Sequence, residues 1–162
     1  MLGGTKMSII SAASANSVWR GYDYYESKGV IKYIKISDSE YEAKVKGSNN
    51  QVYDVFLDID HPRKSKCNCP HAKDRQIVCK HMVATYFTIF PEEAKKFMEE
   101  VAAYEKEEEA RIERKYKKLR EYVNSLTKDE LRVELLIFLG ESPEWRVDAF
   151  LNEHGYYGED DY

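Results

Sequence analysis

All three cysteines of this 162-residue chain lie close in sequence to one of its four histidines. They form the pattern Cys67-x-Cys69, then nine residues, then Cys79-x-His81. Thiolate and imidazole are ligands that Zn²⁺ prefers, and four of them fill its tetrahedral shell. The pattern therefore predicts one zinc ion held by Cys67, Cys69, Cys79 and His81.

A filled coordination shell predicts a structural metal, because catalytic zinc keeps one position open for water or substrate. The sequence shows no nucleophile–base pair, phosphate-binding loop or paired carboxylates, and we therefore predict that the protein is not an enzyme. His71, between the two ligand pairs, is an alternative fourth ligand in place of His81.

The spacing of the ligands predicts the elements that carry them. Residues two apart in an extended strand point the same way, so Cys67 and Cys69 can face one metal from a strand or hairpin. In a helix, residues two apart point about 200° apart, so Cys79 and His81 cannot both lie within one. We expect His81 in the first turn of a helix that continues through residues 82–90, which gives a zinc-bound ββα finger.

The segment before the finger predicts a helix and a small antiparallel sheet. Residues 14–28 carry apolar side chains at helical spacing, and Gly21 among them indicates a close contact that needs a bare backbone. After residue 30 the helical period gives way to strand patterns, and apolar residues alternate with polar ones in the later strands, as in antiparallel strands with one buried face. These strands are expected at 30–36, 41–46 and 54–59, with the helix covering the apolar face.

The segment after the finger predicts helices alone. Apolar residues from Phe97 to Leu126 recur about every 3.6 residues, which indicates one long helix that begins at Pro91. A capping box at Thr127-x-x-Glu130 begins a second helix, and Pro143 begins a third. We expect the two short helices to fold back on the long one as a helical hairpin bundle; otherwise the long helix forms a dimer or binds a partner.

The chain is therefore predicted to be α+β, with an N-terminal helix, a small antiparallel sheet, the zinc finger and an all-α C-terminal extension. Four parts are expected: a flexible N-terminus at 1–13, a zinc finger domain at 14–90, a helical extension at 91–155 and an acidic tail at 156–162.

The charge is distributed unevenly along the chain. Residues 1–90 carry 13 Lys/Arg and 9 Asp/Glu, whereas residues 91–162 carry 12 and 20. A nucleic-acid surface is therefore expected in the first half. Its candidates are the cations around the metal ligands: Arg63, Lys64, Lys66, Lys73, Arg75 and Lys80. Aromatic residues interleave poorly with them, so base stacking is not expected. Arg20 stays unassigned between anchoring a carboxylate and contacting a phosphate.

The sequence also predicts where the protein works. No run approaches the roughly 18 apolar residues that span a bilayer, and the first fifteen residues lack the features of a secretory signal. Clustered cysteines with metal spacing favour a reducing compartment. We predict an intracellular protein, cytoplasmic or (in a eukaryote) nuclear, with no membrane contact.

From Cys67-x-Cys69-Pro70 through Cys79-Lys80-His81 to Val83-Ala84 the sequence resembles the SWIM zinc finger. The likeness extends upstream through Arg20-Gly21-x-x-Tyr24-Tyr25-x-x-Gly29, and so covers about residues 14–90. The resemblance implies the same four zinc ligands, and binding to DNA or to protein partners instead of catalysis. No helicase or transposase motif accompanies it within this sequence, so we expect a freestanding module.

Two functions follow as expectations. One is a zinc-stabilised nucleic-acid-binding module, with DNA as its ligand, that is accessory to a DNA-processing or regulatory complex. The alternative is a protein-interaction adaptor whose acidic C-terminal helices recruit a protein partner without direct nucleic-acid contact. A homodimer through the long helix is compatible with both.

Overall fold

A computed structural model describes residues 7–47 and 51–155, and the acidic tail at 156–162 lies outside this range. The elements, in chain order, are α1 (Ile9–Ala12), α2 (Ala15–Glu26), β1 (Val30–Lys35), β2 (Glu40–Lys46), β3 (Val52–Asp58), the 3₁₀ turn η2 (Pro62–Lys64), β4 (Lys66–Cys67), α3 (Lys80–Ile89), α4 (Pro91–Ser125), α5 (Lys128–Gly140) and α6 (Glu144–Glu153). The chain divides into two compact units, Met1–Ala102 and Ala103–Tyr162. The predicted α+β class with a helical C-terminal region is confirmed.

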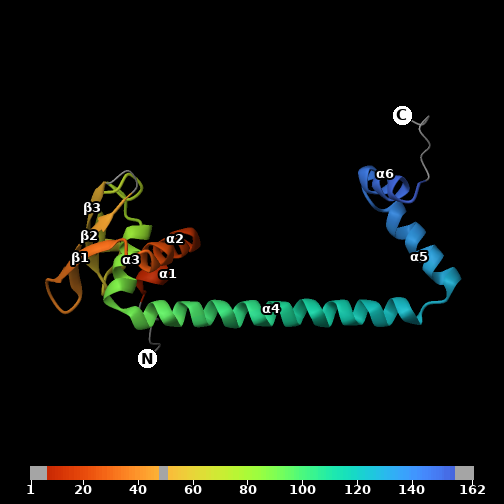
Figure 1. Ribbon diagram of the computed structural model, residues 1–162, viewed down its shortest axis with the longest axis horizontal. Coiled ribbons are helices and arrows are strands. Elements are labelled where there is room, and N and C mark those ends of the chain that lie inside the picture. Colours follow the sequence, from red (N-terminus) through yellow and green to blue (C-terminus); the bar gives the residue numbers. More distant parts are fainter. Residues whose placement is uncertain (1–6, 48–50, 156–162) are drawn as a thin grey trace, which may run out of the picture. The chain divides into compact units, whose positions relative to one another are not determined.

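The first unit is built on an antiparallel sheet in the order β1-β2-β3-β4. Its register places Tyr33, Ala43, Val55 and Cys67 opposite one another on one face. Helix α3 packs against the sheet and α2 packs against α3 (Figure 1). The predicted alternation is confirmed on β2 and β3, because the residues of this face are buried: Tyr41, Ala43, Val45, Val55 and Leu57.

Helices α2 and α3 meet at Gly21, which is buried. A Cβ built on Gly21 would lie 2.5 Å from the Cβ of Val83 and 3.0 Å from the carbonyl oxygen of Lys80. Real Cβ atoms do not approach other carbons this closely, so the two backbones can touch only where a side chain is missing. The close contact expected from the sequence is confirmed.

The described part of the segment expected to be flexible contains a short helix. Helix α1 begins with a capping box between Ser8 and Ser11. Ile9 is only 1% exposed and belongs to the core, and Ala13 forms a parallel bridge with Val78. Residues 9–12 are thus helical and packed, whereas the sequence predicted a flexible segment. The short apolar patch around Ile9 did not indicate this, because the residues that it packs against are remote in sequence.

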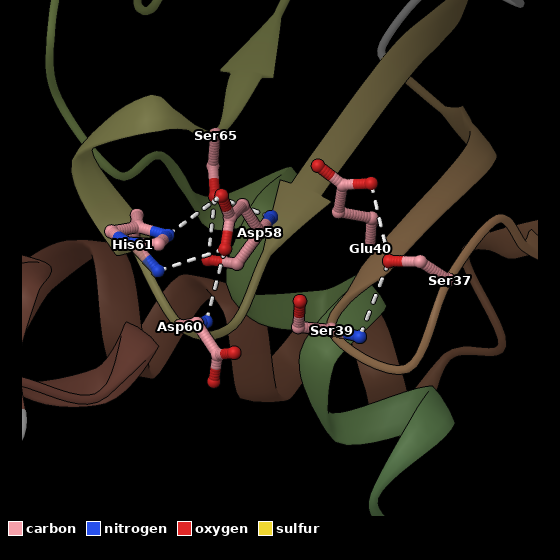
Figure 2. A network of polar contacts seen from close by, with 7 residues as sticks. All are labelled: Ser37, Ser39, Glu40, Asp58, Asp60, His61 and Ser65. Atoms are coloured by element: carbon pink, nitrogen blue, oxygen red, sulfur yellow. Dashed lines mark hydrogen bonds and ion pairs between the residues drawn. The ribbon is translucent and has the colours of Figure 1, made fainter.

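The turn between β3 and β4 is fixed by Asp58, whose side chain is nearly buried (Figure 2). Its carboxylate accepts hydrogen bonds from the backbone N–H groups of Asp60 (3.0 Å) and His61 (2.8 Å), and contacts Nδ1 of His61 at 3.2 Å. The hydroxyl of Ser65 accepts a bond from the Asp58 N–H at 3.0 Å. The turn therefore holds β4, with Cys67 at its end, against β3.

The long helix begins at Pro91 as predicted, but the first compact unit extends to Ala102, beyond the expected end of the zinc finger domain at residue 90. Pro91 opens α4 with two glutamates in its first turn, which suits the positive end of a helix dipole. The ring of Phe97 lies 5.2 Å from Trp19 and 5.8 Å from Phe87, so the first turns of α4 belong to the core of the first unit. The predicted capping box of α5 is present, with the Glu130 N–H donating to Thr127.

The second unit does not form the expected helical hairpin bundle. Neither α5 nor α6 has a buried residue, and Leu136 and Trp145 are 70% and 65% exposed. Between Tyr104 and Ile112 the stripe of α4 is interrupted by charged side chains, so it is too thin to cover α5. Within the described ranges, no helix combines the length and apolarity that crossing a bilayer requires.

We predict that Gly21→Ala lowers the midpoint temperature of thermal unfolding. Far-ultraviolet circular dichroism measures this midpoint. Alanine favours a helix by about 1 kcal/mol over glycine, but overpacking against Val83 costs typically 1–3 kcal/mol. The matched control is Gly140→Ala, also in a helix, where a Cβ would meet nothing within 4 Å. A Gly21→Ala variant that is as stable as the control would contradict the close contact.

Candidate metal centre

The structure brings the four predicted ligands together. One ligand atom each from Cys67, Cys69, Cys79 and His81 lie within 4.8 Å of one another. Cys67 ends β4, Cys69 lies two residues further on, and Cys79 is the extended residue that caps α3, with His81 in its first turn. His71 is exposed in the loop and lies outside this group, which favours His81 as the fourth ligand.

One nitrogen of His81 faces the sulfurs. Its Nδ1 lies 3.7 Å from Sγ of Cys67 and 4.0 Å from Sγ of Cys79. Zinc with Zn–S near 2.3 Å and Zn–N near 2.0 Å places tetrahedral ligand atoms roughly 3.4–3.8 Å apart. The two distances from Nδ1 are thus close to those of a zinc shell, in which Nδ1 would be the binding nitrogen, and all four ligand atoms lie within 4.8 Å of one another. The other nitrogen, Nε2, is buried and has no hydrogen-bond partner among the described residues.

The four ligands are buried, each 4% exposed or less. Among the protein groups alone, a hydrogen bond between Cys67 and Cys79 raises the pKa of Cys67 and lowers the pKa of Cys79 to about 4. Burial raises the pKa of the Cys69 thiol. The protein by itself therefore favours one thiolate here, and three thiolates need a cation to offset burial and mutual repulsion. A divalent metal with a preference for sulfur fits this donor set.

Two tyrosines orient the imidazole ring. The ring of Tyr53 on β3 lies 4.8 Å from that of His81, and the ring of Tyr24 on α2 lies 5.3 Å from it, edge to face. Lys80 donates a hydrogen bond of 2.9 Å to the Tyr24 hydroxyl. No local pattern in the sequence places these tyrosines at the site, because they come from elements distant from the ligands along the chain. Only the Tyr24-Tyr25 part of the family likeness could have indicated one of them.

The residues predicted to bind nucleic acid lie on several elements. Five are exposed and Lys80 is half-buried. Arg63 and Lys64 lie on η2, Lys73 and Arg75 lie in the loop between the ligand pairs, and Lys80 lies beside the metal centre. Lys66 lies on β4 next to Cys67, so its side chain points to the outer face of the sheet.

That outer face carries a groove of about 500 Å³, lined by Lys32, Ile34, Lys44, Phe56 and Lys66 among others. Phe56 lies directly opposite Lys66 in the strand register. The structure thus sets an aromatic ring beside cations, although the sequence indicated no such neighbour. The reason is that strand pairing joins positions ten residues apart.

We predict that Cys79→Ser lowers the zinc content, measured by mass spectrometry of the metal, from one ion per chain to near zero. The same change should unfold the first unit, since zinc binding is worth on the order of 10 kcal/mol in small zinc modules. His81→Ala should act in the same way.

The control for both variants is His71→Ala, which should keep its zinc because this residue lies outside the ligand group. Zinc loss in His71→Ala, or unchanged zinc content and thermal stability in Cys79→Ser, would contradict the ligand assignment.

Comparison with known families supports the assignment of these four residues as zinc ligands. Residues 53–89 match the family model of the SWIM zinc finger. This range begins on β3 and ends with α3, and it includes all four ligands. Comparison with curated proteins and with solved structures found no match. Residues 53–89 of this chain are therefore a SWIM zinc finger, a binding module that holds one structural zinc ion.

Proposed function

We propose that this protein is a zinc-stabilised nucleic-acid-binding module, with DNA as its first candidate ligand, accessory to a DNA-processing or regulatory complex. The observation that carries the proposal is the charge of the finger. Arg63, Lys64, Lys66, Lys73, Arg75 and Lys80 stand against only Asp60 and Asp74 between residues 60 and 80, and most of these cations are exposed. Such side chains make phosphate contacts that do not depend on base sequence.

The outer groove of the sheet supports a single strand as the ligand. Lys32 and Lys66 form no ion pair within the described residues, whereas Lys44 pairs with Asp54. Two lysines are thus free to contact phosphates while Phe56 offers a ring on which a base can stack. Stacking on an aromatic side chain contributes about 1–3 kcal/mol per base and requires an unpaired base.

We expect a labelled single-stranded 20-mer to bind in about 50 mM salt, and to bind more weakly in about 200 mM salt, because bound phosphates release counterions. Lys66→Glu should weaken binding several-fold and lower the slope of log K against log salt by about 0.7. Fluorescence anisotropy measures the affinity and its dependence on salt, and a duplex of the same sequence is measured for comparison.

The matched control is Lys106→Glu, which changes the charge equally but lies on α4 in the second unit. Absence of binding at the lower salt concentration would contradict the proposal. If the two variants lose the same amount of affinity, the groove is not the binding site for the strand.

A second candidate function, protein interaction through the C-terminal helices, is favoured by their exposed apolar side chains. Along α4, five apolar residues recur at alternating spacings of four and three, as in a coiled-coil seam: Ile112, Tyr116, Leu119, Val123 and, just after the helix, Leu126. The first four are each at least 39% exposed, as are most large apolar residues of α5. Exposed apolar surface of this kind usually marks an interface.

We propose a second copy of this chain as the occupant of that surface. The seam is self-complementary, because in an antiparallel pair centred on Leu119 the Ile112 end of one copy lies opposite the Leu126 end of the other. The apolar residues of the two copies then pack against one another, and this contact is what supports self-association.

The test is the mass in solution, by light scattering coupled to gel filtration. We expect the wild type to have about twice the 19.0 kDa mass of one chain. The Leu119→Asp variant, which places a charge in the seam, should have the mass of one chain. Leu119→Met keeps the volume and the apolar character, and should remain dimeric. A monomer at all concentrations up to about 100 μM, well above the micromolar range of specific association, would contradict self-association.

A further inference from the structure

Arg20, which the sequence left between a carboxylate anchor and a phosphate contact, lines a cavity of about 290 Å³ beside the metal centre. Other residues of the lining include Ser14, Asn16, His71 and Lys80, and none of the lining residues is acidic. Arg20 lies on the 12-residue helix α2 and forms no ion pair within the described ranges. Among the described residues, no carboxylate therefore pairs with this guanidinium.

The charge of the metal centre does not account for both cations. Three thiolates and Zn²⁺ sum to one negative charge, and the ion's own charge must enter any account of the site. Lys80 alone balances this charge, and its position is fixed by the 2.9 Å hydrogen bond to the Tyr24 hydroxyl and by the Tyr24 ring, 4.2 Å below its nitrogen. Arg20 therefore leaves one positive charge in excess at the cavity.

The rest of the lining offers donors that suit an oxyanion. Asn16 contributes an amide and Ser17 a hydroxyl, whereas the hydroxyl of Ser14, the N-cap of α2, already donates to Ser17 at 3.0 Å and accepts from the Ser17 N–H at 3.2 Å. Asn16 and Ser17 lie in the first turn of α2, whose dipole also favours an anion. A guanidinium can donate two parallel hydrogen bonds to the oxygens of one phosphate, which a lysine cannot.

We propose that this cavity binds one phosphate group of a nucleic-acid strand, with Arg20 as the residue that contacts its oxygens, while Lys80 balances the charge of the metal centre. This inference rests on the proposed nucleic-acid function and gives it a defined phosphate site. Arg20, on α2, and Lys80, at the start of α3, reach the site from the two helices that touch at Gly21. The site therefore exists only when the first unit is folded around its metal.

The experiment compares full-length wild-type protein with Arg20→Ala and Arg20→Lys, with the single-stranded 20-mer as the probe. We expect Arg20→Ala to weaken binding about tenfold and to lower the salt slope by about 0.7, and Arg20→Lys to restore only part of the affinity. Arg132→Ala, on α5, is the matched control. Zinc content and thermal midpoint should not change in any variant, because Arg20 is exposed.

Competition by inorganic phosphate distinguishes a specific phosphate site from a general attraction between the positive charge of Arg20 and the strand. At equal ionic strength, phosphate should displace the oligonucleotide from the wild type more strongly than chloride does, and this difference should disappear in Arg20→Ala. If the wild type binds DNA and Arg20→Ala binds it equally well, the cavity is not a strand-binding site, even if free phosphate binds there, while the proposed function stands. If the wild type binds no DNA, the proposed function fails and this inference fails with it.

Discussion

The repulsion among three buried thiolates, which only a cation can offset, is the constraint on which the first unit depends. The ligands come from the end of β4, the segment after it and the first turn of α3, so the metal joins the sheet to the helices. Three residues around the centre hold these segments in position. The buried carboxylate of Asp58 sets the turn before β4 (Figure 2), and Tyr24 and Tyr53 enclose the imidazole. Because the shell is filled, the ion organises surfaces and leaves no position for a substrate.

The contact between Gly21 and Val83 extends this organisation to a helix that contributes no ligand. It brings α2 close enough to α3 for Tyr24 to reach His81 and Lys80. In consequence, Arg20 lines the same cavity as the residues around the metal. The finger and the preceding helix therefore form one structural unit, although the match to the SWIM family begins only at residue 53.

The helices of the second unit are stabilised differently. Their local signals are strong: a capping box at Thr127, and pairs of opposite charge one turn apart on α4, such as Lys117 with Glu121. Exposed pairs of this kind contribute only about 0.3–0.5 kcal/mol each. The apolar residues of α5, which in most proteins would supply the remaining stability by packing, are unburied. Helices with such exposed apolar surface are suited to association.

The sequence by itself determined the features that depend on local spacing. The ligands followed from residues two apart, the strands from alternation, the long helix from its period and the first short helix from its capping box, since each pattern is set by the geometry of a few neighbouring residues. Even Gly21 could be recognised as a close contact, but not its partner Val83. Only the tertiary structure decided which distant side chains meet: Ile9 with the core, Phe56 with Lys66, and Tyr24 with Lys80. These contacts depend on strand register and helix packing, which join residues that no local period relates.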